Sequence, residues 1–247
     1  MQSSPSRFNQ QRIRKNPTGG VIKTTVDQIM RYVIDCYLYM LEEKPHFSKS
    51  DFKETTTYKF EDLLSDRFVD DYLRTRKKEY FSHALLNQII FTKQSSENYT
   101  NCITHIQQPD LIDIYVTNLQ IDKELSSNPQ HYFAIECKRI RKSSSFDEYV
   151  ADIKKVTERI HSQTRLPYEG QIAFIEKPQY SHNVTVEKIN SKLDIHESIK
   201  TIQPLKHKQF HEMFDGSYCS KHLKNFGVNN EFAIYHLMLD YTQIVTD

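Results

Sequence analysis

The chain of 247 residues contains no tryptophan and only five glycines. So little glycine argues against an enzyme that holds a nucleotide in a glycine-rich loop, and neither GxGxxG nor GxxxxGK[ST] occurs. No apolar run approaches the roughly 18 residues of a transmembrane helix, and the N-terminus lacks the apolar segment of a secretory signal. We therefore predict a protein without a membrane-spanning segment.

The four cysteines are scattered, at positions 36, 102, 137 and 219. This distribution favours a reduced, cytoplasmic protein over one held together by disulfides. The residues His207, His211, Cys219 and His222 form a loose HxxxH…CxxH pattern whose spacing zinc could use. Eleven histidines are spread through the chain, and matches this loose are mostly accidental, so we do not predict a zinc site there.

The charges of the chain nearly cancel, with 33 Lys and Arg against 32 Asp and Glu and a net charge of +1. Any binding of nucleic acid must therefore come from local basic patches. Hydrophobic residues make up 38% of the chain, which is enough for a folded core. We predict a flexible basic tail over residues 1–20 and a single domain over 21–247, mainly helical at 21–95 and containing the sheet core and C-terminal part at 100–247.

Apolar periodicity predicts helices at 26–43, 60–77, 79–90 and 146–161. The first and last of these are expected to begin with capping boxes, at Thr25 with Gln28 and at Ser145 with Glu148. Strands are predicted at 103–106, 111–116, 131–138 and 171–177, with the second and third adjacent in space. Residues 232–241 fit either a strand or a helix, and we favour a strand. This order of elements is typical of a mixed α/β fold with a central sheet.

The predicted strands at 111–116 and 131–138 carry Asp113, Glu136 and Lys138. Residues i and i+2 of a strand share a face, so Glu136 and Lys138 point the same way while Cys137 points into the opposite layer. Such charges on an otherwise apolar sheet are costly without a metal or a partner. We predict a Mg²⁺ site formed by Asp113, Glu136 and the backbone carbonyl of Cys137. Lys138 would position or activate the attacking water and stabilise charge on a scissile phosphate.

A D/E-x-K triplet is weakly specific by itself, because it occurs at 42–44, 51–53, 136–138 and 152–154. Only the triplet at 136–138 lies on a predicted apolar strand that follows another Asp-bearing strand. Asp110 and Asp113 both qualify as the first carboxylate, and strand alternation places them on opposite faces. We favour Asp113, because Asp110 can be solvated at the strand entrance whereas Asp113 would otherwise lie unpaired against covering helices.

The stretch PDLIDIYV, the following hairpin, HYFAIECKRIRK, the predicted helix 146–161 and the strand 171–177 resemble the PD-(D/E)xK nuclease superfamily. The resemblance covers roughly residues 60–177. It implies a restriction-endonuclease-like core, in which helices flank a central mixed sheet, with an α-helical N-terminal extension. It also implies a phosphodiesterase site at a sheet edge that uses Mg²⁺, or Mn²⁺ in its place. The segments ECKRI…YVADIKK…YEGQIAFIEK are similar to nucleases of bacterial defence loci, which implies restriction or antiviral defence.

Members of this superfamily often carry a further Glu on the first core helix, and Glu61 is the best match, ahead of Asp62 and Asp71. Glu61 is in register with the predicted buried stripe, although a Glu here could equally serve to stabilise the helix N-terminus. The basic segment KRIRK directly follows the predicted site. We expect Arg139 and Arg141 to contact the phosphates of a nucleic acid, with DNA as the favoured substrate.

The leading hypothesis is a cytoplasmic, Mg²⁺-dependent endonuclease that hydrolyses phosphodiester bonds, acting as a homodimer or with an ATPase or helicase subunit. The alternative is a catalytically inactive nuclease-fold subunit that binds nucleic acid or a partner protein. A third interpretation is an α/β protein with a coincidental triplet. Retention of Asp113, Glu136 and Lys138 favours the enzyme, because an inactive subunit has no use for all three charges.

Overall fold

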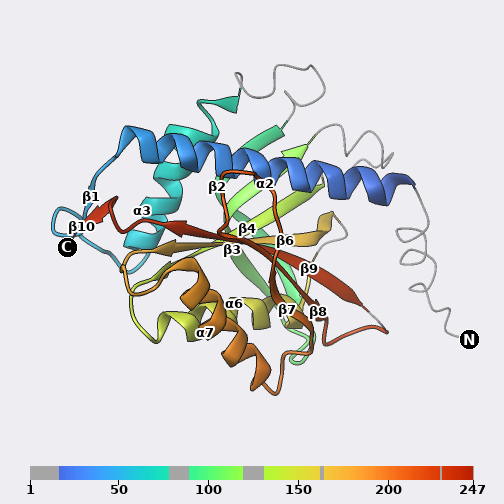
Figure 1. Ribbon diagram of the computed structural model, residues 1–247. Coiled ribbons are helices and arrows are strands. Elements are labelled where there is room, and N and C mark those ends of the chain that lie inside the picture. The colour runs from blue at the N-terminus through green and yellow to red at the C-terminus, as the bar shows by residue number, and fades with distance from the viewer. Residues whose placement is uncertain (1–16, 78–88, 119–130, 162–163, 229, 247) are drawn as a thin grey trace, which may run out of the picture.

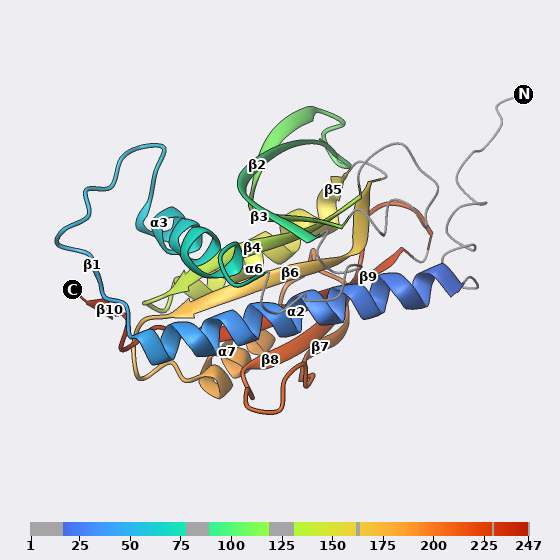
Figure 2. The same cartoon turned by 90° about the horizontal axis from the view of Figure 1, so that it is seen from above.

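A mixed eight-stranded sheet forms the centre of the protein, and helices lie on both of its faces (Figures 1 and 2). The computed structural model describes residues 17–77, 89–118, 131–161, 164–228 and 230–246. The strand order is β5-β2-β3-β4-β6-β9-β8-β7. The pairs β4–β6 and β6–β9 are parallel and the other pairs antiparallel. The strands are β2 (Ile89–Asn101), β3 (Gln107–Asn118), β4 (Tyr132–Ile140), β5 (Arg159–Ile160), β6 (Arg165–Ile175), β7 (Thr201–His207), β8 (Ser217–Leu223) and β9 (Glu231–Asp240).

The helices divide the core into two layers. The long α2 (Pro17–Glu43), α3 (Phe60–Arg67) and the π-helical turn η1 (Phe68–Leu73) cover one face, where they pack with Phe133, Ile135 and Cys137 of β4. The other face is covered by α6 (Ser145–Glu158) and α7 (His182–Asp194). A short parallel pair, β1 (Phe47–Ser48) with β10 (Val245–Thr246), lies apart from the sheet. None of the helices in the described ranges is long and apolar enough to cross a membrane.

The predicted α/β class and its central sheet are confirmed. Strands cover 111–116, 132–138, 171–175 and 232–240, and the pair predicted to be adjacent forms an antiparallel ladder between β3 and β4. In β6, residues 169–175 are all buried, as expected for a strand that is covered by helices on both faces. The crossover from β4 through α6 to β6 joins parallel neighbours, as a helical connection does.

The N-terminal helix begins earlier than predicted. It starts at Pro17 rather than at residue 26, so Thr25 lies inside the helix and the predicted capping box at Thr25 and Gln28 is wrong. Ile22 and Val26, 5% and 0% exposed, extend the buried stripe toward the N-terminus. This packing outweighs the cost of the two glycines in the first turns, about 1 kcal/mol each. Residues 17–20 therefore belong to this helix, and residues 1–16 lie outside the described residues.

The strand predicted at 103–106 is also wrong. Residues 102–104 form a turn, Ile103 and Ile106 are 63% and 55% exposed, and the strand that leads into this turn is β2. β2 was missed because its middle is polar and only partly buried, where the β2–β3 hairpin curls away from the rest of the sheet (Figure 2). Of the helix predicted at 79–90, residues 79–88 lie outside the described residues, and Ile89 and Ile90 belong to β2.

Two further helix boundaries differ from the prediction. The helix predicted at 60–77 changes to π-helical geometry at Phe68 and leads into a turn after Leu73. The helix predicted to end at residue 161 ends at Glu158, because Arg159 and Ile160 pair with β2 as β5. Its N-cap is Ser144 without a side-chain cap bond, so the predicted capping box at Ser145 is wrong. The Ser145 hydroxyl instead accepts hydrogen bonds from the backbone N–H groups of Arg141 and Lys142.

Candidate active site

Asp113 and Glu136 lie opposite each other on neighbouring strands. The β3–β4 ladder ends at the pair Ile114 and Ile135, and the next residues in this antiparallel register are Asp113 and Glu136. Beyond that pair, Asp113 Oδ2 accepts a hydrogen bond of 2.7 Å from the backbone N–H of Cys137. The aspartate side chain therefore takes the place of a main-chain ladder bond, which fixes its carboxylate against β4.

Glu61 reaches the same position from the first turn of α3. Its Oε1 lies 2.8 Å from Lys138 Nζ, and its Oε2 accepts a 2.8 Å hydrogen bond from the backbone N–H of Arg139. The structure therefore brings together all four side chains that were predicted to form the site, Glu61, Asp113, Glu136 and Lys138.

Asp152 of α6 also belongs to this cluster and was missed in the sequence. Its Oδ2 lies 3.3 Å from Lys138 Nζ, and its Oδ1 accepts a 2.6 Å hydrogen bond from Lys155. Asp152 is only 7% exposed and shares a helix face with Tyr149, Ile153 and Val156. A carboxylate in an otherwise apolar stripe was the signal that could have identified it. The triplet 152–154, which had looked incidental, thus contributes its acid to the site.

The electrostatics of the cluster separate its acids from its lysine. Burial, with a smaller contribution from the nearby Glu61 carboxylate, raises the pKa of Asp113 to about 7, against the lowering effect of the Cys137 N–H. Burial, and next the Asp113 carboxylate, raises the pKa of Glu136 well above its ordinary value. Burial by itself lowers the pKa of Lys138, but Glu61 and Asp152 outweigh it, so the pKa of Lys138 lies above its ordinary value. Lys138 is therefore a permanent cation beside two carboxyls that resist ionisation together.

A small cavity adjoins Glu136 and Asp152 on the α6 side of the sheet. Its volume is about 10 Å³, and its lining includes Glu136, Asp152, Glu169 and Gln171. The side-chain N–H of Gln171 donates to the backbone carbonyl of Tyr149, while its Oε1 is buried with no hydrogen-bond partner among the described residues. An additional oxygen donor thus lies beside the carboxylates. In the described ranges, no group of three or more His, Cys, Asp or Glu side chains is placed to hold a metal ion. The predicted site differs from such a group, because it consists of two carboxylates and one backbone carbonyl.

The two arginines predicted to contact phosphate differ in placement. Arg141 is exposed just beyond the end of β4. Arg139 is 6% exposed, donates to both carboxylate oxygens of Glu176, and lies over the ring of Phe60 at 4.6 Å. Arg139 points to the face of β4 opposite Lys138, since neighbouring residues of a strand point to opposite faces. This placement argues against the predicted phosphate contact of Arg139, whose guanidinium is bound within the fold.

Cys137 lies in the core, as predicted, whereas Asp110 is partly buried within β3 rather than solvated at the strand entrance. Asp110 is at the outer part of β3 and forms an ion pair with Arg159, which also lies 4.2 Å over the ring of Tyr99. Asp110 therefore has its own partner outside the cluster around Glu136. Cys137 is fully buried in the layer beneath α2, and burial raises the pKa of its thiol well above the ordinary value. The thiol is a core group, as its strand position predicted.

His236 and His222 form a buried chain of hydrogen bonds on the α6 side of the sheet. The Tyr149 hydroxyl lies 2.9 Å from His236 Nδ1, and the Ser220 hydroxyl lies 2.7 Å from His236 Nε2 and 2.8 Å from His222 Nε2. Both histidines are 0% exposed. His236 is thus a hydrogen-bonded core histidine, as predicted, and His222 belongs to the same buried hydrogen-bond chain.

We expect these histidines to make the fold sensitive to acid. Burial lowers the pKa of His222 to about 4 and that of His236 well below its usual value, so both remain neutral when folded. In the unfolded chain these histidines bind protons below about pH 6.5, whereas in the folded protein they stay neutral. The free energy of unfolding therefore decreases as the pH falls from about 6.5 toward 4. Denaturant unfolding of the wild type and of His222→Asn should show the stability difference shrinking by about 2 kcal/mol from pH 7 to pH 5. A difference that is constant with pH would show that His222 titrates normally in the folded protein.

Comparison with models of protein families, with curated proteins and with solved structures finds no match to this chain.

Proposed function

We propose that this protein is a Mg²⁺-dependent nuclease that hydrolyses phosphodiester bonds in DNA, with Mn²⁺ as an alternative ion. The observation that carries the proposal is the pair of facing carboxyls, Asp113 and Glu136, beside the cationic Lys138. Charged groups collected in this way on a sheet otherwise filled with apolar side chains destabilise the fold unless they serve a ligand or a reaction.

The arrangement of elements around the site supports a restriction-endonuclease-like core. Helix α3 precedes three antiparallel strands, β2, β3 and β4, and then α6 leads to the parallel strand β6. The resemblance to PD-(D/E)xK nucleases rests on the part of this order that comprises β3, β4, α6 and β6, and β2 was not part of it. The two acids and the lysine lie on the second and third of these strands, and Glu61 lies on the preceding helix, as that resemblance also implied.

The residues present fit a hard divalent cation in their chemistry. Asp113 and Glu136 supply carboxylate oxygens, the preferred ligands of Mg²⁺. Burial, and next the Asp113 carboxylate, raises the pKa of Glu136, as a neighbouring anion does. The buried Oε1 of Gln171 adds an oxygen next to Glu136. Asp113, Glu136 and the carbonyl of Cys137 would hold the ion. When bound, the ion would polarise the phosphate and favour ionisation of a water molecule.

The structure refines the role that we propose for Lys138. Its raised pKa makes it a poor proton acceptor, so the ammonium would orient a water molecule and stabilise negative charge on the phosphate rather than remove a proton. Glu61 and Asp152 hold the ammonium at 2.8 and 3.3 Å and so act as positioning residues. The exposed Arg141 remains the candidate for contact with the DNA backbone. A cytoplasmic role in restriction or antiviral defence, as a homodimer or with an ATPase or helicase subunit, is part of the same proposal.

The alternative is a nuclease-fold subunit that binds nucleic acid or a partner protein without cutting. The observation that favours it is the completeness of the internal contacts, since Lys138 has two acidic partners and Asp113 is held by a main-chain N–H. In that case the charges form a purely structural network.

Plasmid cleavage tests the proposed function. We expect the purified chain to convert supercoiled DNA to open or linear forms with Mg²⁺ or Mn²⁺ and not with EDTA. Glu136→Ala should lower this rate at least about 100-fold, because it removes a carboxylate from the reaction centre. Glu187→Ala, an exposed glutamate on α7, is the control and should cleave normally. Equal metal-dependent cleavage by the wild type and Glu136→Ala would rule out this site.

A further inference from the structure

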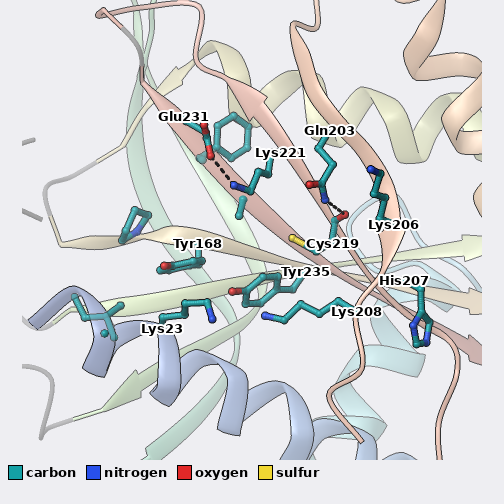
Figure 3. A pocket seen from close by; sticks show the side chains of 15 residues that line it. Lys23, Tyr168, Gln203, Lys206, His207, Lys208, Cys219, Lys221, Glu231 and Tyr235 are labelled. Atoms are coloured by element: carbon teal, nitrogen blue, oxygen red, sulfur yellow. Dashed lines mark hydrogen bonds and ion pairs between the residues drawn. The ribbon is translucent and has the colours of Figure 1, made fainter. Parts of the chain in front are cut away.

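A large cavity lies between the N-terminal half of α2 and the strands β6, β7, β8 and β9 (Figure 3). Its volume is about 660 Å³, within the range of pockets that bind small molecules. Tyr168, Cys219 and Tyr235, which line it, pack with the core layer beneath α2, whereas the cavity beside Glu136 borders residues of α6. None of the proposed active-site residues lines this larger cavity. It is therefore a separate site.

The wall of this cavity is basic, with four lysines and His207 against one lining acid, Glu231, which pairs with Lys221 at 3.0 Å. Asp27 of α2 pairs with Lys208 at 2.6 Å and with Lys23 at 3.6 Å, so the cations still outnumber the acids around the cavity. The lysines come from three elements, with Lys23 on α2, Lys206 on β7, Lys221 on β8, and Lys208 just after β7. The net charge of the whole chain is only +1, so this excess of cations is local. A run of lysines along one exposed helix face is usually just solvated. Lysines that converge on one concave surface from separate elements can instead act together on one anionic ligand.

Aromatic rings form the floor between these cations. The rings of Tyr168 and Tyr235 lie with their centroids 5.6 Å apart at 34°. Lys208 Nζ is 3.8 Å from the centroid of Tyr235 and 2.6 Å from Asp27, so a half-buried ammonium is held over one ring (Figure 3). Tyr168 is half-buried and lines the cavity. The cavity thus combines a flat aromatic surface with several ammonium groups at its rim.

We propose that this cavity binds a nucleotide, either free or as one unit of a single strand. Ammonium groups recognise phosphate as point charges, and aromatic rings stack on bases of any sequence. The phosphates would lie among Lys23, Lys206 and Lys221, and the base against Tyr168. An inorganic anion makes no use of the tyrosines, and an apolar ligand makes no use of four lysines. The proposal goes beyond the nuclease activity and does not depend on it.

Titration of the full chain with ATP, a short oligothymidylate and tripolyphosphate tests the proposal. EDTA in the buffer excludes metal-dependent cleavage and keeps the readout independent of the carboxylate site. We expect Lys206→Glu to weaken binding of the nucleotide probe at least about tenfold, since it reverses a charge at the rim. The matched control is Lys200→Glu, an exposed lysine that does not line the cavity, and it should change the dissociation constant less than about twofold.

The two other arms test the aromatic surface and the source of the nucleotide. Tyr168→Ser should weaken ATP or oligothymidylate without weakening tripolyphosphate, because it removes only the stacking surface. Tighter binding of ATP would assign the cavity to a free nucleotide, and tighter binding of oligothymidylate to a single strand. Absence of binding by both, equal binding by Lys206→Glu and Lys200→Glu, or tripolyphosphate binding as tight as that of ATP would overturn the proposal. Thermal unfolding of each variant shows whether it is folded.

Discussion

Replacing Lys138 with methionine is expected to lower the rate of metal-dependent plasmid cleavage by about 100-fold to 1,000-fold. Methionine keeps an unbranched apolar stem and removes the ammonium that lies 2.8 Å from Glu61 and 3.3 Å from Asp152. Removing one partner of an ion pair with low exposure also destabilises the fold, because the acids lose their cation. Cleavage must therefore be measured at a temperature where circular dichroism shows the variant to be folded.

The chain supplies a matched control in Lys155. Its ammonium also binds Asp152, at 2.6 Å from Oδ1, but it lies on the exposed side of α6. If cleavage is lost only because Asp152 loses a cation, Lys155→Met should reproduce the defect. If Lys138 acts on the reacting phosphate, Lys155→Met should cleave within about threefold of the wild type. A Lys138→Met protein that is folded and fully active would remove Lys138 from the proposed mechanism.

Replacing Glu136 with glutamine is expected to stabilise the metal-free protein at neutral and alkaline pH. Burial and Asp113 raise the pKa of Glu136 in the folded state, so the folded protein holds protons that the unfolded chain releases. The wild type therefore loses stability as the pH rises from the pKa of Glu136 in the unfolded chain, about 4.3, through its pKa in the folded protein. Glutamine has no charge to bury. The variant should gain on the order of 2 kcal/mol in the free energy of unfolding at pH 8 in EDTA, and less at pH 5.

Glu169→Gln provides a control of opposite sign. Glu169 lies beside the same small cavity, but its carboxylate accepts hydrogen bonds of 2.9 and 2.7 Å from Arg165. Glutamine there leaves the buried guanidinium with Glu97 as its remaining counterion, so this variant should be less stable than the wild type. Urea unfolding of the three proteins at pH 5 and pH 8 measures both effects. Lower stability of Glu136→Gln at pH 8 would show that Glu136 has a stabilising partner rather than an electrostatic cost.

The side chains that share a face of the sheet at the site could be predicted, because strand alternation is a strict geometric rule. It placed Glu136 and Lys138 together, Cys137 in the opposite layer and Asp113, not Asp110, beside Glu136. The same rule, applied to Arg139, would have separated it from Lys138. The prediction that Arg139 contacts phosphate rested on its closeness in sequence to Lys138. In the structure its guanidinium instead binds Glu176 inside the fold.

The parts that were missed depend on tertiary contacts rather than on local pattern. β2 is polar along its middle and becomes a strand through pairing with β3, which no periodicity of its own reveals. The first turns of α2 contain two glycines and are helical where Ile22 packs in the core. Asp152 lies 14 residues along the chain from Lys138, and only the packing of α6 against β4 brings the two charges together.

Isothermal titration of the wild type with Mn²⁺ at pH 7.5 tests most directly whether the facing acids are a cation site. Asp113→Asn and Glu136→Gln are measured beside it, with Asp147→Asn as the control for an exposed acid on α6. We predict one ion per chain for the wild type and for the control, with proton release because the raised pKa values leave these carboxyls partly protonated. Both site variants should bind at least about tenfold more weakly. Equal Mn²⁺ affinity in all four proteins, or no binding by the wild type, would contradict the central claim that Asp113 and Glu136 hold a metal ion.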